Sequence, residues 1–239
     1  RRRRQLSLDV VAQWLVSSLT LRLAELVCSG ALGELRSLSF LQRKPRFTRS
    51  LTNRSHRSAF DVEPPHSVGV ALRLAGAARL AGAACRDMVV GDTVLPGLGS
   101  ARLTLRHDCG VRTEIISDLT SPVRERRIVL RFDRGVAVGH YPGSQDDDYA
   151  QLSVVAHGDA EAPGLRARSV FRDDALGAFL LRAYHRFSAP EVDGSDFALN
   201  VAATRLLCAA KQWPAGADEQ HCSPAGRPAE PSLLSGGPS

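Results

Sequence analysis

The sequence lacks a long hydrophobic run, a paired-cysteine motif and a glycine-rich phosphate-binding turn. No stretch of about 18 uncharged apolar residues occurs, so we expect no membrane-spanning helix and no membrane partner. The five cysteines are odd in number and have no Cys-x-x-Cys spacing, which favours reduced thiols in a cytoplasmic protein over a disulfide framework or a metal site. A Gly-x-Gly-x-x-Gly sequence, the fingerprint of dinucleotide binding, is also absent.

The first residues do not form a convincing targeting signal. RRRRQLSLDVVAQWLV has the basic head of a signal peptide, but Asp9 and Gln13 interrupt its apolar part and no small-residue cleavage site follows. Residue 1 is arginine and the only methionine is Met88. We therefore expect the chain to be part of a longer protein.

What the sequence does contain is hydrophobic material for a full core and an uneven distribution of charge. Hydrophobic residues make up 44% of the 239 residues. Residues 1–57 hold 12 Arg and Lys against 3 Asp and Glu, or +9, so the remainder carries −3 of the net +6. The densest basic run is QRKPRFTRSLTNRSHR, residues 42–57, with six basic residues and no acidic one.

Three interpretations of this basic run are open: a solvated loop, contacts to an anionic small molecule or cofactor, or nucleic-acid binding. Only Phe47 interleaves as a stacking aromatic, and arginine outnumbers lysine 29 to 2 throughout, so we expect no nucleic-acid partner. Contacts to a small molecule would make Lys44, Arg46 and Arg49 substrate-binding residues.

The first hundred residues predict a mixture of short elements. Leucine spacing with Gly30 as a C-cap predicts a helix, and alternation predicts a strand soon after it. In chain order we expect a short β-rich run at 9–16, a helix at 19–30, a strand at 34–44, a long basic loop up to His66, a helix at 67–83 and a turn-rich connection at 91–100.

The rest of the sequence predicts an antiparallel meander followed by two helices. Alternating apolar and polar residues with short Gly- or Asp-bearing connectors indicate strands at 101–107, 111–119, 126–132, 135–141, 149–157 and 165–172. Helices are expected at 174–187 and 196–213, with Asp196 as N-cap, before a Pro-, Gly- and Ser-rich disordered tail. The predicted class is α+β, a predominantly antiparallel open-faced sheet with helices packed on one face.

Several segments resemble one family. Four segments, in their order and spacing, are similar to segments of the Gfo/Idh/MocA oxidoreductases, the glucose–fructose oxidoreductase and inositol dehydrogenase group. These segments are SGALGELRSLSF, PHSVGVALRLAG, the strand pair from ARLTLRH to RRIVLRFDRGVAVGHYP, and the closing helices from DALGAF to AAKQW. The resemblance covers residues 9–213.

The resemblance implies a two-domain enzyme of which this chain is one half. Members of the family bind NAD or NADP on an N-terminal Rossmann domain, and neither that fingerprint nor the family's Glu-Lys-Pro motif is present; Lys44-Pro45 follows Arg43. We therefore expect residues 1–33 to be a remnant of the last strand and helix of the cofactor domain, 34–213 to be the substrate and dimerisation domain, and 214–239 to be the tail. Alone, such a chain is expected to be inactive.

The resemblance also assigns a role to His66, which in the family takes the hydroxyl proton while hydride leaves the same carbon. A helix N-terminus disfavours the imidazolium, which suits a general base. The family's two aspartates are replaced by Val62 and Gly69. Glu63 is the candidate partner of His66, ahead of Asp61.

The function implied is that of the substrate-binding half of an NAD(P)-dependent oxidoreductase acting on a sugar, cyclitol or similar polyol or carbonyl. The alternative is a non-catalytic binding or dimerisation module that has lost its cofactor domain. A homodimer or tetramer through the open sheet face is expected. We interpret His107, His140 and His157 as structural or surface histidines, and the acidic run at 146–148 as a solvated turn. Tyr141 and Tyr184 are expected to be core or sheet residues.

Overall fold

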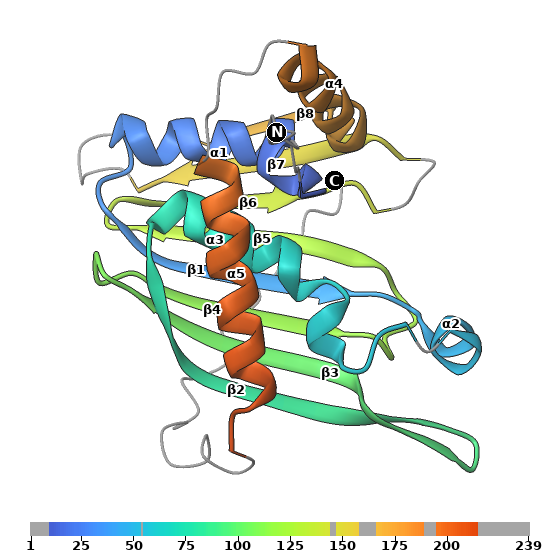
Figure 1. Cartoon of the computed structure of the whole chain (residues 1–239). Helices are drawn as coiled ribbons and strands as arrows, with labels where there is room; N and C mark the ends of the chain where they lie inside the picture. Colours follow the sequence, from blue (N-terminus) through green and yellow to red (C-terminus); the bar gives the residue numbers. More distant parts are fainter. Residues whose placement is uncertain (1–9, 54, 144–146, 158–165, 189–194, 215–239) are drawn as a thin grey trace, which may run out of the picture.

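The structure is a computed structural model that describes residues 10–53, 55–143, 147–157, 166–188 and 195–214 (Figure 1). The helical elements are η1 (Gln13–Val16), α1 (Ser18–Ser29), α2 (Phe47–Thr52), η2 (Ala59–Asp61), α3 (Pro64–Ala75), α4 (Ala175–Ser188) and α5 (Ser195–Lys211). The strands are β1 (Leu35–Arg43), β2 (Ala78–Val90), β3 (Thr93–His107), β4 (Arg112–Asp118), β5 (Glu125–Phe132), β6 (Gly135–His140), β7 (Tyr149–Ala156) and β8 (Arg166–Arg172). The tail predicted from residue 214 on lies outside the described residues, Pro214 excepted.

All eight of these strands form one sheet in the order β2-β3-β4-β1-β5-β6-β7-β8. Every neighbouring pair is antiparallel except β1 and β4, which run parallel. The α+β class with a mostly antiparallel open sheet is therefore confirmed. The uninterrupted meander is wrong, because β1 inserts between β4 and β5, where Phe40 lies opposite Ile115 on one side and Ile128 on the other.

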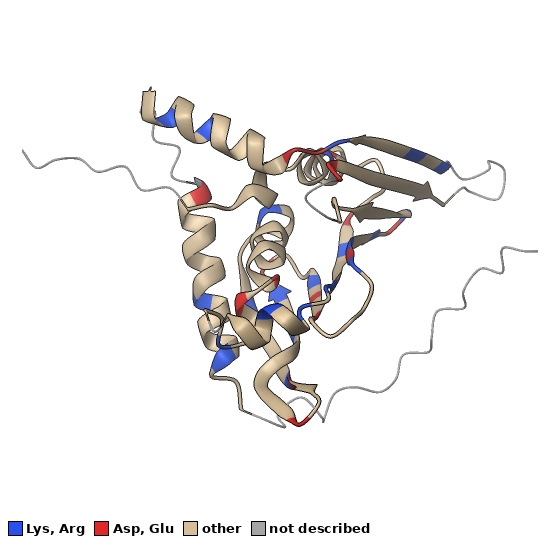
Figure 2. Ribbon diagram, turned by 90° about the vertical axis from the view of Figure 1, so that its right-hand side faces the viewer, with Lys and Arg blue, Asp and Glu red and all other residues tan. Residues whose placement is uncertain are grey.

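The helices α1, α3 and α5 lie on one side of the sheet, as the front and edge-on views show (Figures 1 and 2). Alternation along the strands directs one set of side chains toward these helices. Leu103, Leu105 and Ile115 are fully buried in that layer, whereas Val129 and Val138, directly paired across β5 and β6, belong to the opposite face. No helix among the described residues is long and apolar enough to cross a membrane.

Local signals set the ends of the first helix. The Ser17 side chain accepts a hydrogen bond from the backbone N–H of Thr20, and Gly30 ends α1 with a φ of 63°. This agrees with the helix expected at 19–30. The β-rich run expected at 9–16 is wrong: Trp14, Leu15 and Val16 are consecutive buried residues of a 3-10 turn, which packs on α3 and α4 instead of pairing in the sheet.

The helix expected at 67–83 is shorter and is followed by a strand. Two prolines in the first turn start α3, and Gly76, with a φ of 77°, ends it. The chain from Ala78 on then forms β2, which pairs with β3 through a hairpin at Gly91 and Asp92. The connection expected at 91–100 is therefore also wrong, because most of it belongs to β3.

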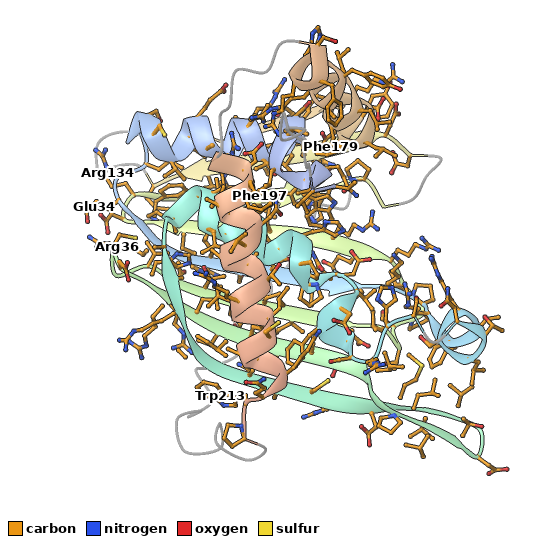
Figure 3. All side chains as sticks on the ribbon, in the orientation of Figure 1. Glu34, Arg36, Arg134, Phe179, Phe197 and Trp213 are labelled. Atoms are coloured by element: carbon orange, nitrogen blue, oxygen red, sulfur yellow. The ribbon has the colours of Figure 1, made fainter. Side chains whose placement is uncertain are left out.

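The basic segment at 42–57 is not one long loop. It contains the end of β1 and the short helix α2, and η2 follows with a capping box between Ser58 and Asp61. Asp196 is not the N-cap of α5 but lies in its first turn, where it pairs with Arg182 and Arg186 of α4. Trp213, just beyond α5, lies near β2 at the far end of the helix layer (Figure 3).

Candidate active site

A buried carboxylate lies at the start of α3. Glu63 is only 4% exposed, and Lys44 Nζ donates a 2.7 Å hydrogen bond to its Oε1, while Arg126 Nε lies 3.6 Å from Oε2. Burial alone would raise the pKa of Glu63, but the charges of Arg126 and Lys44 more than offset it and hold that pKa below its usual value. Glu63 is therefore a permanent anion at neutral pH, between two cations.

His66 lies one turn into α3, where its backbone N–H donates to the carbonyl of Glu63. Its ring stacks on Trp14, with 5.2 Å between the ring centroids and 20° between the planes. Burial lowers the pKa of His66; Glu63 opposes this shift, and Arg126 and Lys44 reinforce it. The imidazole is therefore neutral near pH 7, the form that a proton acceptor needs.

Glu63 was expected to be the direct partner of His66, but its carboxylate forms its hydrogen bond with a different residue. The Glu63 carboxylate is bonded to Lys44, a residue of the predicted basic run, and acts on His66 through its charge. Asp61 bonds the backbone N–H groups of Arg57 and Ser58 and pairs with Lys211, so it caps η2 and ties it to α5.

Two aromatic residues extend the site beyond the histidine. Trp14 stacks on Tyr141 with 4.2 Å between centroids and 16° between planes, and Arg126 lies 5.8 Å from the Trp14 ring. Tyr141 is 5% exposed, and its hydroxyl shares a 2.8 Å hydrogen bond with Thr20 Oγ1. Burial raises the pKa of Tyr141 far above its usual range, so the phenol stays protonated.

A cleft of about 950 Å³ opens next to this stack. It includes all three residues predicted to bind substrate, Lys44, Arg46 and Arg49, together with Arg126 and Tyr141. Its full lining is Gln13, Trp14, Lys44, Pro45, Arg46, Phe47, Thr48, Arg49, Arg124, Arg126, Tyr141, Pro142, Asp147, Asp148, Asp173, Asp174, Ala175 and Leu176. The volume lies in the range of small-molecule sites, which is about 300–1,000 Å³.

His66 does not line this cleft. It lines a separate cavity of about 130 Å³ between η1, α3 and α5, where Gly69 and Asn200 are among its neighbours. Trp14 lines both cavities, so its ring stands between the predicted base and the predicted substrate-binding residues. The sequence prediction placed these groups in one site, whereas the structure places them on two sides of one tryptophan.

Sequence reasoning did not single out Trp14 or Arg126 and treated Tyr141 as a core or sheet residue. Trp14 was assigned to a strand, which gave no reason to place it near His66. Arg126 and Tyr141 meet the site only through the pairing of β5 with β6, where Tyr141 donates its backbone N–H to the Arg126 carbonyl. A register of this kind has no local sequence signal.

Comparison of the fold with solved structures finds similar chains among ketoreductases, dehydrogenases and other oxidoreductases. The 3-ketoreductase KijD10 from Actinomadura kijaniata, as a variant in complex with TDP-benzene and NADP, has a TM-score of 0.69 at 15% identity over 88% of this chain and 62% of that chain. The UDP-N-acetylglucosamine 3-dehydrogenase GnnA from Acidithiobacillus ferrooxidans has a TM-score of 0.62 at 16% identity over 88% and 61%. An NAD-binding oxidoreductase from Klebsiella pneumoniae has a TM-score of 0.64 at 14% identity over 85% and 62%.

These neighbours are Gfo/Idh/MocA-type oxidoreductases, so the resemblance drawn from the sequence is confirmed at the level of the fold. The chain spans about three fifths of the length of the solved structures it matches, 62% for the first. No protein-family model matches the sequence, and no curated protein matches it.

Proposed function

We propose that this chain is the substrate-binding half of an NAD(P)-dependent oxidoreductase that acts on a sugar, cyclitol or similar polyol or carbonyl compound. The observation that carries the proposal is the buried Glu63 with its two cations, beside a neutral His66 and a ligand-sized cleft. The shared fold supports it, because neighbours are a 3-ketoreductase and a sugar-nucleotide dehydrogenase.

The proposed division between substrate binding and cofactor binding rests on the sequence, which has no Gly-x-Gly-x-x-Gly turn. None of the longer helices α1, α3, α4 and α5 begins at a glycine-rich turn after a strand; α1 follows the 3-10 turn η1, and α3 follows Glu63. We therefore assign substrate binding and proton transfer, and no cofactor site, to this chain. On this proposal residues 1–33 join the chain to the cofactor domain, and NAD or NADP held there supplies the hydride chemistry.

Within this division of labour, His66 accepts the proton of the substrate hydroxyl. Its neutral ring provides the lone pair, and the resulting imidazolium lies within the field of the Glu63 anion. The Trp14 ring, which lines both cavities, must move for the substrate in the cleft to reach His66. Lys44 donates to Glu63 and also lines the cleft.

An exposed apolar surface supports the existence of a further domain. On α4, Leu180, Leu181, Tyr184 and Phe187 are between 48% and 73% exposed, and Phe197 at the start of α5 is 47% exposed (Figure 3). Several exposed apolar residues on one helix are typical of an interface. We place the cofactor domain on it, because this chain matches only 62% of the length of the first neighbour.

We also propose that two copies associate through the open sheet face. Its centre carries Leu41 paired with Ile116, and Val129 paired with Val138, with arginines such as Arg131 further out. Apolar residues at the centre with charged residues around them are the usual composition of a protein interface. The expected assembly is a homodimer, or a tetramer built from such dimers.

The separation of His66 from the cleft favours a second candidate, a binding or dimerisation module without catalysis. The coding DNA upstream of Arg1 discriminates between the two. An in-frame strand followed by Gly-x-Gly-x-x-Gly supports the enzyme, and the extended protein should then oxidise or reduce members of a sugar and cyclitol panel with NAD(P)(H). A start codon immediately before Arg1, with no turnover of any panel member, supports the module.

A further inference from the structure

One cation of the cleft is largely buried and has no direct ion-pair partner among the described residues. Arg46 is only 5% exposed, yet within the described part of the chain its guanidinium forms neither an ion pair nor a hydrogen bond. The backbone holds it in place, because its N–H donates to the Leu119 carbonyl at 3.1 Å and its carbonyl accepts from the N–H of Ser50 at 2.8 Å. These bonds fix the backbone from which Arg46 lines the wall of the cleft.

A buried, unpaired guanidinium is unfavourable for folding. Arginine does not lose its proton in proteins, so burial strips water from a charge that stays. Burial lowers the pKa of Arg46, and the nearby charge of Arg49 lowers it further. The charge of Glu63 raises this pKa, but not enough to return it to the ordinary arginine value. A buried polar group without a hydrogen-bond partner calls for an explanation, and an anionic ligand in the cleft would supply the partner that Arg46 lacks.

The cations of the cleft fall into two groups. Lys44 and Arg126 are engaged with Glu63, and Arg126 also donates to the Pro142 carbonyl. Arg46 and Arg49, by contrast, repel each other, and both also disfavour a positive charge on His56. The pKa of His56 is lowered mainly by burial and further by these two charges. The first group forms ion pairs with Glu63, whereas Arg46 forms none and is affected more by the like charge of Arg49 than by the opposite charge of Glu63.

The acidic residues of the same cleft do not neutralise this second group. Asp148 pairs with Arg172. Asp173 accepts hydrogen bonds of 2.7 Å from Ser17 Oγ and from the backbone N–H of Ser18, so it holds the start of α1. Asp174 accepts from the backbone N–H of Gly177 at 2.9 Å. Asp147, the fourth acidic residue of the lining, accepts from the backbone N–H of Tyr149 at 3.1 Å. Among the described residues, none of these four carboxylates forms an ion pair with Arg46 or Arg49.

We propose that Arg46 and Arg49 form an oxyanion subsite, which binds a phosphate or carboxylate group carried by the polyhydroxylated substrate. The planar guanidinium presents paired N–H donors that match two oxygens of such a group. Arg46 supplies the buried, preorganised contact, and the exposed Arg49 supplies a second charge at the same wall. The proposal deepens the proposed function by naming the class of substrate, and it rests on that function only for the identity of the carrier.

The first test uses inorganic phosphate as the probe and the full chain as it is. Thermal unfolding is followed with rising sodium phosphate at constant ionic strength, for the wild type, Arg46→Met and the matched control Arg112→Met, an exposed arginine of β4 outside the cleft. We expect phosphate to raise the Tm of the wild type and of Arg112→Met by mass action, and to leave that of Arg46→Met unchanged.

The same experiment contains a readout that a structural arginine would not give. Without phosphate, Arg46→Met should unfold at the same temperature as the wild type or higher, because an unpaired buried charge is replaced by an apolar chain of similar length. Equal phosphate-dependent shifts in the wild type and Arg46→Met would overturn the proposal. If Arg46→Met does not fold, the test uses Arg49→Gln, a substitution of an exposed residue. The subsite predicts that phosphate raises the Tm of Arg49→Gln by less than that of the wild type. An equal rise in Tm would contradict the subsite.

A second test identifies the carrier. Calorimetric titration with glucose 1-phosphate, glucuronate and glucose separates a phosphate from a carboxylate, and both from an uncharged sugar. At least a tenfold loss of affinity is expected for the anionic ligand in Arg46→Met, since hydrogen bonds to charged groups are the stronger class. Glucose binding as tightly as both anions contradicts the subsite. These titrations need no cofactor, so an anion-binding chain without oxidoreductase activity would defeat the proposed function and leave the subsite standing.

Discussion

Lys44 donates a 2.7 Å hydrogen bond to the buried carboxylate of Glu63, and this contact joins the end of the central strand β1 to the first turn of α3. Arg126 of β5 approaches the second oxygen of the same carboxylate at 3.6 Å. The site is thus held by charges from three elements that are distant in the chain. The histidine one turn further along α3 takes its position from this arrangement.

The first prediction concerns the stability of this arrangement. Glu63→Gln removes the anion and leaves Lys44 and Arg126 without their counter-charge, which should reduce the free energy of unfolding by about 3 kcal/mol. For a chain of this size the Tm should fall by roughly 6–12 °C. Chemical and thermal denaturation measure both quantities, with the exposed Glu25→Gln as control. A Tm within a degree of the wild type would show that the two cations do not depend on Glu63.

The second prediction concerns pH. Burial is the main cause that lowers the pKa values of His56, His66, His107 and His140 in the folded chain. As the pH falls, the unfolded chain therefore takes up protons on these histidines before the folded chain does. Stability should therefore be constant above about pH 7 and decline as the pH falls below the ordinary histidine value of 6.5. Tm measured from pH 8 to pH 5 tests this decline.

One histidine gives the matched variant for this experiment. His107 is 4% exposed, and its Nδ1 lies 2.9 Å from the Gly76 carbonyl while Nε2 lies 2.8 Å from Thr113 Oγ1. A neutral ring that donates from Nδ1 and accepts at Nε2 satisfies both contacts. His107→Gln should make the decline with acid shallower, and the exposed His185→Gln is the control. An unchanged slope in His107→Gln would rule out this ring as a contributor.

The third prediction concerns the base. In a protein with its cofactor domain in place, His66→Ala should lower kcat by roughly 10²–10⁴ and leave dinucleotide affinity nearly unchanged, as expected for loss of a general base. Trp14→Phe, which keeps an aromatic ring between the two cavities, should retain much more activity. Loss of folding in His66→Ala, with no separate effect on rate, would instead indicate a packing role for the ring.

The fourth prediction concerns the cofactor. The chain alone should bind NAD(H) and NADP(H) weakly or not at all, because on the proposed division of labour the dinucleotide-binding turn lies outside this chain. Calorimetric titration measures this directly. A micromolar dissociation constant for either dinucleotide would place a cofactor site within these residues and overturn the division of labour proposed above.

Local signals in the sequence were enough to predict part of this structure. Gly30 ends α1 as expected, because a residue with positive φ after a helix is a local requirement. The two prolines that start α3 are also a local signal, but the helix was expected to begin only at residue 67. Alternation predicted the six strands from residue 101 on, since each has one buried face.

Other features depend on distant parts of the chain and had no local signal. The alanine-rich segment that forms β2 is intrinsically suited to a helix, and only pairing with β3 makes it a strand. The insertion of β1 beside β4 is a choice of partner that alternation cannot specify. At the site, the sequence brought His66 and Glu63 to attention but could not show Trp14 between His66 and the basic residues, because that contact depends on how η1 packs on α3.

The fifth prediction concerns assembly. Val129 and Val138 are direct partners on the face of the sheet opposite to the helices, and neither reaches the buried core. If two copies meet on this face, Val129→Asp buries two carboxylates, related by the two-fold axis, in the apolar centre of the interface, which is strongly unfavourable. Sedimentation velocity at tens of micromolar, on the chain ending at Trp213, should show a dimer or tetramer for the wild type and a monomer for Val129→Asp.

The matched control for assembly is the double variant Arg46→Gln/Arg49→Gln, which removes charge from the cleft and leaves the open face intact. It should sediment as the wild type does, whereas an interface through the basic segment would dissociate. The Tm of Val129→Asp, after correction for the loss of association, should equal that of the wild type. This result would show that the substitution acts on the interface and not on the fold. A wild-type chain that is purely monomeric at these concentrations would exclude the sheet face as a self-association surface.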